Sequence, residues 1–432
     1  MASVESSAAE ARASYVPDPR EQEAYDEIAR TRIAPWLTGW MVAGFLVLLA
    51  AGPALEMLAI ARERSQIWRP LAGPGAAGVG AALDALRGSI AELELRFDER
   101  SELVRRVRPW VQAALLRIGR YGNEQAYAGR DGWLVYRPDF DHLTYARTGP
   151  QFEGDPVRVI VDFRDQLADR GIGLVLLPAP VKPSIHVESL ARGHDAPAPL
   201  APERQQAVLE AVETAGVDIV DPAASLHRRA AAGSPIYLLA DTHWRPEGAD
   251  AVARDVAVAL RARGELPVGD PGLLAEDPQT IDGLGDTAVL LDLPRGFARS
   301  LHQRVETRRV VAPDGAPWRP TRGAPVLLLG DSFSAVFSLP DLGWGSGAGL
   351  VERLSFHLGL PVDRIVRNAG GASATREALG DELTRDPGRL DGVRVVVWEF
   401  AVRELSQGAW RPVELPASAA TAPQRVGLAR RR

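Results

Sequence analysis

The chain shows two hydrophobic patterns. Residues 33–55 are uncharged and mostly apolar, whereas from about residue 121 short β-branched runs alternate with segments of helical period. Continuous apolar runs that are separated by helices are typical of a mostly parallel sheet covered on both faces. The pattern therefore predicts a three-layer α/β domain behind an apolar N-terminal segment.

Individual elements of the domain can be placed from the same pattern. Strands are expected over 172–177, 217–220, 236–239, 326–329, 365–366 and 393–398. Helices are expected over 157–169, 202–214 and 245–263, and prolines stand at the start of the first and the last of these. Residues 264–325 break the alternation, so irregular or antiparallel structure is expected there.

The N-terminal region suggests a membrane anchor. Residues 1–32 are polar and acidic and are expected to form a disordered tail. The 23 residues of 33–55 would span about 34 Å as a helix, enough for a bilayer core of about 30 Å, and Trp36 and Trp40 resemble an interfacial aromatic belt. We therefore expect a transmembrane helix within 33–60. A buried core helix is the alternative, and the flanking arginines do not decide the orientation.

Residues 61–120 are expected to form a helical stalk. The Gly/Ala/Pro-rich stretch 71–80 reads as a hinge, and apolar residues in 81–120 recur mostly every three or four positions, with charges between them. These residues form either amphipathic helices that lead into the domain or the first helical layer of its core. The domain is expected to cover 121–411, followed by a Pro/Ala-rich disordered tail over 412–432.

Composition narrows the chemistry that the domain can carry. Lys and Arg number 50 and Asp and Glu 56, so the formal net charge of −6 argues against a protein that coats nucleic acid. The chain has no cysteine, which excludes disulfides, cysteine-ligated metals and thiol nucleophiles. No phosphate-binding glycine loop, His-Glu-x-x-His helix or dinucleotide fingerprint occurs either, so we expect neither a metal nor another cofactor.

A candidate nucleophile follows the strand expected over 326–329. In Gly330-Asp331-Ser332-Phe333-Ser334, a serine on a sharp strand-to-helix turn would be presented at the sheet edge, where open α/β sheets bind their ligands. Gly330 permits the tight turn. Asp and Ser are also common N-caps, so this motif alone does not separate a nucleophile from a helix start.

A candidate base follows the strand expected over 236–239. Of the seven histidines, only His243, in Asp241-Thr242-His243-Trp244, has an aspartate two residues before it. That spacing can bring a carboxylate to Nδ1 of the ring and leave Nε2 to take the proton of Ser332. An ordinary surface or core histidine is the alternative for His243 alone. Two such loops at strand ends of one sheet favour a triad of Ser332, His243 and Asp241.

Further candidate loops are less specific. The segment Asn368–Ser373 contains Gly370, and its glycines would either let a backbone amide approach a reacting oxygen or form a plain turn. Glu399 comes after the last expected strand and reads as a carboxylate at a helix start. The glycine-rich segment 343–349 is either a mobile flap beside the nucleophile or a loose loop. Three tryptophans could stack on sugar rings but are expected as core residues: Trp244, Trp344 and Trp398.

These motifs resemble the alginate O-acetyltransferase family, of the AlgJ/AlgX type with an SGNH-hydrolase-like domain. The resemblance covers roughly residues 120–410 and rests on Asp241–Trp244, Gly330–Ser334, Asn368–Gly371, Gly129–Tyr136 and Leu177–Pro183. As in this family, the Asp-x-His precedes the serine, whereas ordinary SGNH esterases place an Asp-x-x-His last.

The resemblance implies a role for each matching residue. Ser332 would be the nucleophile, His243 the general base and Asp241 the residue that orients it, while Gly370 matches the second SGNH block and would contribute to the oxyanion hole. The asparagine of the third block is missing, since Val397-Trp398-Glu399 stands there. The resemblance also implies a cytoplasmic tail over 1–32, an anchor in the cell inner membrane and a periplasmic domain. It further implies a polysaccharide acceptor and a membrane-bound acyltransferase that supplies acetyl groups.

The expected reaction is transfer of an acetyl group to a hydroxyl of an exported polysaccharide through an acetyl-serine intermediate. Water can replace the sugar in this chemistry, so the triad alone does not separate a transferase from an esterase. A membrane-anchored SGNH-type deacetylase and a carbohydrate-binding assembly protein with a vestigial triad remain as alternatives.

Overall fold

The computed structural model describes residues 34, 36–47, 102–144, 153–190, 196–368 and 370–416. Its contacts divide the chain into two units, Met1–Val107 and Arg108–Arg432, and the fold below belongs to the second. In the first unit, residues 36–47 are helical. None of the helices in the described part of the chain combines the length and the apolar character needed to cross a bilayer. The tail predicted over 1–32, residues 48–60 of the predicted anchor, most of the predicted stalk and residues 417–432 lie outside the described residues.

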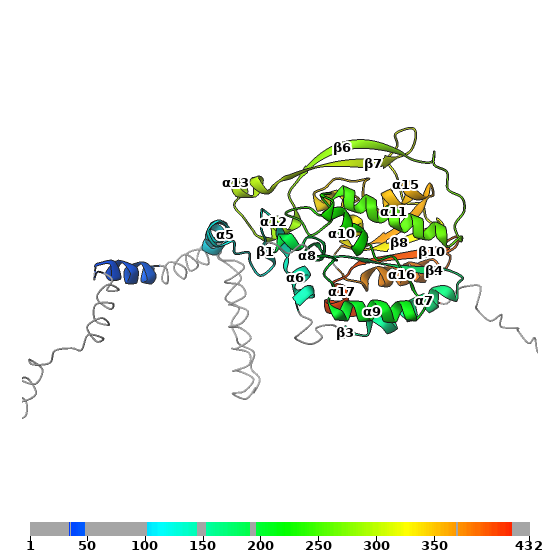
Figure 1. The fold of residues 1–432 in the computed structure, drawn as a ribbon, viewed down its shortest axis with the longest axis horizontal. Coiled ribbons are helices and arrows are strands. Elements are labelled where there is room, and N and C mark those ends of the chain that lie inside the picture. Colours follow the sequence, from blue (N-terminus) through cyan, green and yellow to red (C-terminus); the bar gives the residue numbers. More distant parts are fainter. Residues whose placement is uncertain are drawn as a thin grey trace, which may run out of the picture. The chain divides into compact units, whose positions relative to one another are not determined.

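A five-stranded sheet lies at the centre of the second unit (Figure 1). Its strands are β4 (Gly173–Ala179), β5 (Asp218–Ile219), β8 (Val326–Gly330), β9 (Val362–Val366) and β10 (Val395–Ala401), in the order β5-β4-β10-β8-β9. Every neighbouring pair is parallel, which confirms the predicted sheet. β10 continues beyond the predicted end, so Glu399 lies inside a central strand and not at a helix start.

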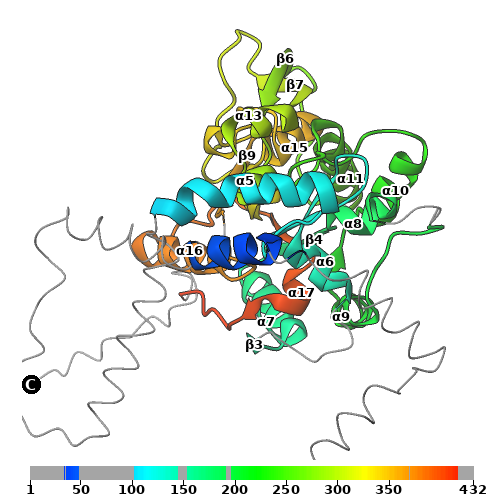
Figure 2. The same cartoon turned by 90° about the vertical axis from the view of Figure 1, so that its left-hand side faces the viewer.

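Helices cover both faces of this sheet, as the three-layer prediction requires. One face carries α10 (Ala223–Ala231), α11 (Pro246–Ala262) and α15 (Leu350–Leu358), and the other carries α7 (Pro156–Ala168), α9 (Glu203–Thr214) and α16 (Ala374–Arg385) (Figures 1 and 2). Successive strand residues point to opposite faces. Val395 and Val397 of β10 therefore join one core cluster, and Val396 and Trp398 join the other.

The local signals for the long helices are confirmed. α7 begins where the side chain of Asp155 accepts hydrogen bonds from the amides of Val157 and Arg158, and Pro156 occupies the first turn. α9 and α11 also lie where the sequence predicts them. Cap and proline positions thus set these helix starts locally, while the apolar stripes fix which face packs on the sheet.

The strand predicted over 236–239 is wrong. Apart from an isolated bridge between Tyr237 and Trp244, this run has no strand pairing. Two of its backbone bonds close its own loop: the amide of Leu238 donates to the carbonyl of His243 (3.1 Å), and that of Arg245 donates to the carbonyl of Ile236 (2.7 Å). A third joins it to β2, because the amide of Leu134 donates to the carbonyl of Leu239 (2.8 Å). A short buried apolar run has the same pattern whether it pairs with a sheet or folds back. The Asp-Thr-His motif therefore lies in a tight loop before α11, not at the end of a sheet strand.

The expectation of antiparallel structure within 264–325 is confirmed. β6 (Ala275–Gly283) and β7 (Gln303–Val311) form a two-stranded antiparallel ribbon that lies over α11 and α15 (Figure 1). Between them are α12 (Asp286–Leu290) and α13 (Arg295–Ala298). The remaining described elements include α5 (Glu102–Gly119), β1 (Ala126–Ala128), β2 (Leu134–Tyr136), α6 (Arg137–Thr144), β3 (Glu153–Gly154), α8 (Lys182–Ile185), α14 (Ser332–Ala335), α17 (Glu404–Gln407) and β11 (Ala409–Trp410).

Candidate active site

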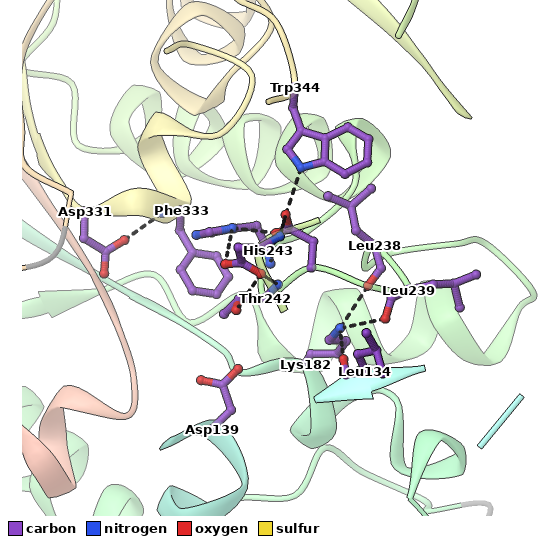
Figure 3. A network of polar contacts seen from close by, with 12 residues as sticks. Leu134, Asp139, Lys182, Leu238, Leu239, Thr242, His243, Asp331, Phe333 and Trp344 are labelled. Atoms are coloured by element: carbon purple, nitrogen blue, oxygen red, sulfur yellow. Dashed lines mark hydrogen bonds and ion pairs between the residues drawn. The ribbon is translucent and has the colours of Figure 1, made fainter. Parts of the chain in front are cut away.

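The carboxylate of Asp241 is buried and accepts four hydrogen bonds. Oδ1 accepts from Nδ1 (2.7 Å) and the amide (2.9 Å) of His243, and Oδ2 accepts from the indole of Trp344 (2.8 Å) and the amide of Asp286 (2.9 Å) (Figure 3). A ring nitrogen that donates to a carboxylate carries the hydrogen, so neutral His243 is held with Nε2 as its free base. The structure thus brings together two residues of the predicted triad in the arrangement that general-base catalysis needs.

The charges of this pair support each other. Burial alone would raise the pKa of Asp241, but the charge and hydrogen bonds of His243, together with the Trp344 indole, outweigh it and lower the pKa to about 2. Burial would likewise lower the pKa of His243, but the carboxylates of Asp241 and Asp286 outweigh it and raise the pKa. The loop therefore favours an imidazolium whenever Nε2 accepts a proton.

A second carboxylate, Asp286 at the start of α12, secures the loop. Its Oδ1 accepts from the amide (2.7 Å) and hydroxyl (3.1 Å) of Thr242, and its Oδ2 lies 3.6 Å from Nδ1 of His243. The close approach of Asp286 to the loop requires glycine at position 285, because a Cβ there would lie 2.0 Å from the carbonyl oxygen of Ala240. Sequence reasoning missed Asp286, since nothing local connects it to a loop some forty residues earlier.

Asp241, His243 and Asp286 could also supply three ligand atoms to a metal, since one atom from each lies within 4.8 Å of the others. The hydrogen bonds oppose that use. Both oxygens of Asp241 are occupied by donors, and Nδ1 of His243 carries the hydrogen that it donates. A metal would have to displace these bonds, so the group fits an imidazole-orienting role better than a cation site.

The Gly-Asp-Ser motif forms the predicted strand-to-helix turn between β8 and α14. Asp331 caps α14, with Oδ1 accepting from the amide of Phe333 (2.8 Å) and Oδ2 from the amide of Ala401 at the end of β10 (2.8 Å). Ser332 is half-buried at the first position of α14. The amide of a first helical residue has no partner within its helix, so the backbone of Ser332 can donate to an oxyanion.

Glu399 of β10 holds this turn from behind. Its Oε2 accepts from the amide of Asp331 (3.0 Å) and from the hydroxyl of Ser334 (2.5 Å), and the side chain is buried. Glycine at position 330 leaves room for the Ser334 hydroxyl, since a Cβ there would lie 2.3 Å from its Oγ. Burial and the neighbouring Asp331 carboxylate raise the pKa of Glu399 well above its ordinary range, so the site disfavours the charged form of this side chain.

The imidazole of His243 contacts the turn of residues 330–334, called the serine turn below, through Phe333. The rings of His243 and Phe333 pack edge to face, with centroids 5.0 Å apart, and Phe333 directly follows Ser332 (Figure 3). Nε2 of His243 is buried and has no hydrogen-bond partner in the described part of the chain, so it is not bonded to Ser332 here. In enzymes without substrate this bond is often long and tightens only when substrate binds. The free base therefore lies against the turn that carries the candidate nucleophile.

An ion pair that the sequence did not reveal lies beside this turn. The guanidinium of Arg403 donates to Oδ1 of buried Asp139 (2.9 Å) and stacks over the rings of Tyr136 (5.4 Å) and Phe333 (5.9 Å). The carboxylates of Asp139 and Asp331 raise the pKa of Arg403 against the opposing effect of burial. The pair places a fixed cation near the serine turn, from segments more than 250 residues apart.

Lys182 binds the other side of the loop of residues 236–245, called the histidine loop below, which carries Asp241 and His243. Its buried ammonium group donates to the carbonyls of Leu134, Leu238 (3.0 Å) and Leu239 (3.2 Å) (Figure 3). Burial lowers the pKa of Lys182 to about 8, although nearby aspartates oppose the shift. The Leu177–Pro183 stretch thus contributes a residue that joins β2 to the loop preceding Asp241.

The remaining candidates differ in their surroundings. Gly370 is exposed on the loop after β9, the strand next to β8, and nothing in the structure assigns it a role. Trp344 is buried and bonded to Asp241, so the 343–349 segment is not loose at this position. Trp244 and Trp398 are buried as well and leave no face free for a sugar.

Comparisons with known proteins match the region of the chain that contains this site. The family described as "SGNH hydrolase-like domain, acetyltransferase AlgX" matches residues 126–402. "Probable alginate O-acetylase AlgJ" of Pseudomonas aeruginosa is 28% identical over 335 residues, which cover 76% of this chain and 83% of that protein. The protein of the same name from Azotobacter vinelandii is 27% identical over 292 residues, covering 66% of this chain and 70% of the other.

Among solved structures, the O-acetyltransferase domain of Pseudomonas putida AlgJ matches with 24% sequence identity and a TM-score of 0.49. The match covers 69% of this chain and 96% of that domain. A structure of Pseudomonas aeruginosa AlgX matches with 20% identity and a TM-score of 0.46, covering 67% of each chain.

Proposed function

Because the chain belongs to the SGNH hydrolase-like family of AlgX-type acetyltransferases, we propose that it transfers acetyl groups to hydroxyls of a polysaccharide. The observation that carries this proposal is the Asp241–His243 pair, whose free Nε2 lies against the turn of Ser332. Ser332 is the nucleophile, His243 the general base and Asp241 the residue that orients the imidazole. An alginate-like polymer is the acceptor that the names of the relatives support.

The first half of the reaction loads the enzyme. Nε2 of His243 takes the proton of Ser332 as Oγ attacks the carbonyl carbon of an acetyl donor. The amide of Ser332 and, from the family resemblance alone, that of Gly370 stabilise the oxyanion, and Asp241 stabilises the imidazolium. Collapse of the tetrahedral intermediate returns the proton to the leaving group and leaves acetyl-Ser332.

The second half transfers the acetyl group. Nε2 removes the proton of a sugar hydroxyl, whose oxygen attacks the ester carbonyl, and collapse releases the acetylated sugar and restores the Ser332 hydroxyl. The acceptor competes with water in this step. Transfer therefore depends on how the domain positions the sugar and excludes water.

The setting in the cell belongs to the same proposal. Residues 33–55, uncharged and bearing Trp36 and Trp40, support a single-pass anchor in the inner membrane with the domain in the periplasm. A membrane-bound acyltransferase would then supply the acetyl groups. These assignments rest on the apolar pattern and on the family.

The test is acetyl transfer by the purified full-length chain. With a chromogenic acetyl ester as donor and alginate oligosaccharides as acceptors, mass spectrometry is expected to find acetylated oligosaccharide with wild type and none with Ser332→Ala. Ser300→Ala, a change of an exposed serine in the α13 region, is the matched control and should leave the yield unchanged. Acetate release without acetylated sugar would instead indicate an esterase, and sugar binding without either product a binding protein.

A further inference from the structure

One face of α5 is apolar and exposed. The exposed fraction is 68% for Trp110, 88% for Ile118 and 66% for Tyr121, which lies just past the end of the helix. Val111 and Leu115 are exposed as well. The helical positions 111, 115 and 118 are three or four residues apart, so they share one face. Exposed aromatic and aliphatic side chains grouped in this way usually mark an interaction surface.

This face is not the side by which α5 packs on its own domain. Gln112 and Ala113 are buried, and Leu116 packs on a small core cluster that contains Ala240 and Ala288. The side-chain amide of Gln112 also donates to the carbonyls of Tyr121 (3.2 Å) and Gly122 (3.0 Å), which fixes the chain after the helix. An ordinary surface helix has one apolar stripe, which faces the core. α5 has a second stripe, on its outer side.

The charged residues within the stretch 108–121 are all basic. Between residues 108 and 121 the chain has Arg108, Arg117 and Arg120 and no acidic residue, although the whole chain has a net charge of −6. Tryptophan and tyrosine beside aliphatic residues, bordered by arginines, are the composition of helices that lie in the headgroup region of a bilayer. Each arginine near an anionic membrane surface adds to the attraction.

We propose that the exposed face of Arg108–Tyr121 docks on an anionic lipid surface. The positive border favours acidic lipid headgroups, and the uncharged run of residues 33–55 stands upstream in the same chain. Leu116 and Ala240 pack in one cluster, and Ala240 directly precedes Asp241, so docking holds the candidate site close to the membrane. This inference concerns lipid binding and does not depend on the proposed reaction.

The absence of cysteine allows a direct test with a single fluorescent label. Ile118→Cys in the full-length chain is labelled with an environment-sensitive nitrobenzoxadiazole dye, and the protein is reconstituted into vesicles that contain phosphatidylglycerol and doxyl-labelled lipid. Val268→Cys, at a position 98% exposed in the loop between α11 and β6, is the matched control. We expect blue-shifted and quenched emission from the dye at 118 and neither change at 268. Salt near 1 M, where the Debye length is about 3 Å, should reduce the quenching at 118.

Four results would overturn the proposal. The first is no quenching at either position, and the second is equal quenching at both, as tethering alone would produce. The third is emission from 118 that is already blue-shifted in detergent and insensitive to doxyl lipid, because another segment of the chain or a second copy would then cover the face. Equal quenching at 118 in vesicles of phosphatidylcholine alone would contradict the role of the arginines.

Discussion

The histidine loop contains one buried carboxyl group, Asp241, and the serine turn is bonded to another, Glu399, and the pKa values of the two groups shift in opposite directions. Asp241 accepts four hydrogen bonds, one from an imidazole that can become cationic, and its pKa falls to about 2. Glu399 accepts two hydrogen bonds, lies beside the carboxylate of Asp331, and has a pKa well above its ordinary range. The negative charge is thus favoured where an imidazolium forms and disfavoured beside the serine turn.

This contrast separates two roles for similar groups. Environments that push two acids apart in pKa commonly distinguish their functions in an active site. The ionised Asp241 is suited to orient and stabilise His243. Glu399, whose charged form is disfavoured, is suited to bind the backbone amide of Asp331 and the hydroxyl of Ser334 with little negative charge near Ser332.

The largest expected effect comes from removing the charge of Asp241. Asp241→Asn keeps the shape but offers an amide that can donate to Nδ1 and so stabilise the wrong tautomer of His243. We expect kcat for acetyl-ester turnover to fall roughly 10⁴-fold, with little change in the fold. Steady-state kinetics with circular dichroism checks this prediction, and a loss below about tenfold would contradict the orienting role.

Glu399 should tolerate the corresponding change. Glu399→Gln keeps an oxygen acceptor for Asp331 and Ser334, and its amide can donate to the Asp331 carboxylate, so kcat and stability should stay close to wild type. Glu399→Leu leaves two donors unpaired and should cost about 1–3 kcal/mol for each in the free energy of unfolding. Urea denaturation measures both variants. Equal destabilisation by Gln and Leu would contradict the prediction that a neutral acceptor at this position is enough.

Two tryptophan variants test the hydrogen bond between Trp344 and Asp241. Trp344→Phe removes the indole donor to Asp241 and should lower kcat/KM roughly tenfold, equivalent to about 1.4 kcal/mol. Trp398→Phe is the matched control, because that buried indole has no hydrogen-bond partner in the described part of the chain. If both variants lose activity equally, packing and not the hydrogen bond explains the effect.

The smallest expected effect is a shift in pH dependence. The base must be neutral to act, and the carboxylates of Asp241 and Asp286 raise the pKa of His243, so the acid limb of kcat/KM should lie above pH 6.5. Asp286→Asn keeps an acceptor for Thr242 but removes one negative charge, which lowers the pKa of His243. We expect the limb to move to lower pH by less than about one unit, because the side chain is partly exposed and its charge is screened. A shift to higher pH would contradict this electrostatic account.

The sequence predicted what depends on local patterns. The parallel strands, the long helices and the Asp-x-His spacing are all set within a few residues, and the structure has them. The strand prediction over 236–239 is wrong because a buried loop and a buried strand have the same hydrophobic pattern. Local signals also predict the serine turn and the strand beside it, but they end that strand before Glu399 and give no indication that Glu399 bonds to the turn.

The partners of these motifs could not be predicted, because they come from distant segments. Trp344 reaches Asp241 across 103 residues from a glycine-rich stretch that reads as flexible. Arg403 meets Asp139 across 264 residues. Tertiary packing alone determines such contacts, and one sequence contains no periodic or spacing signal for them.

The most direct test of the account is to trap the acyl-enzyme. The wild-type chain is mixed rapidly with a chromogenic acetyl ester without acceptor, quenched in acid, digested and analysed by peptide mass spectrometry. We predict one acetyl group on Ser332, absent in Ser332→Ala and lost from wild type when acceptor oligosaccharide is added before the quench. Turnover by wild type without an acetyl group on Ser332, or equal turnover by Ser332→Ala, would contradict it.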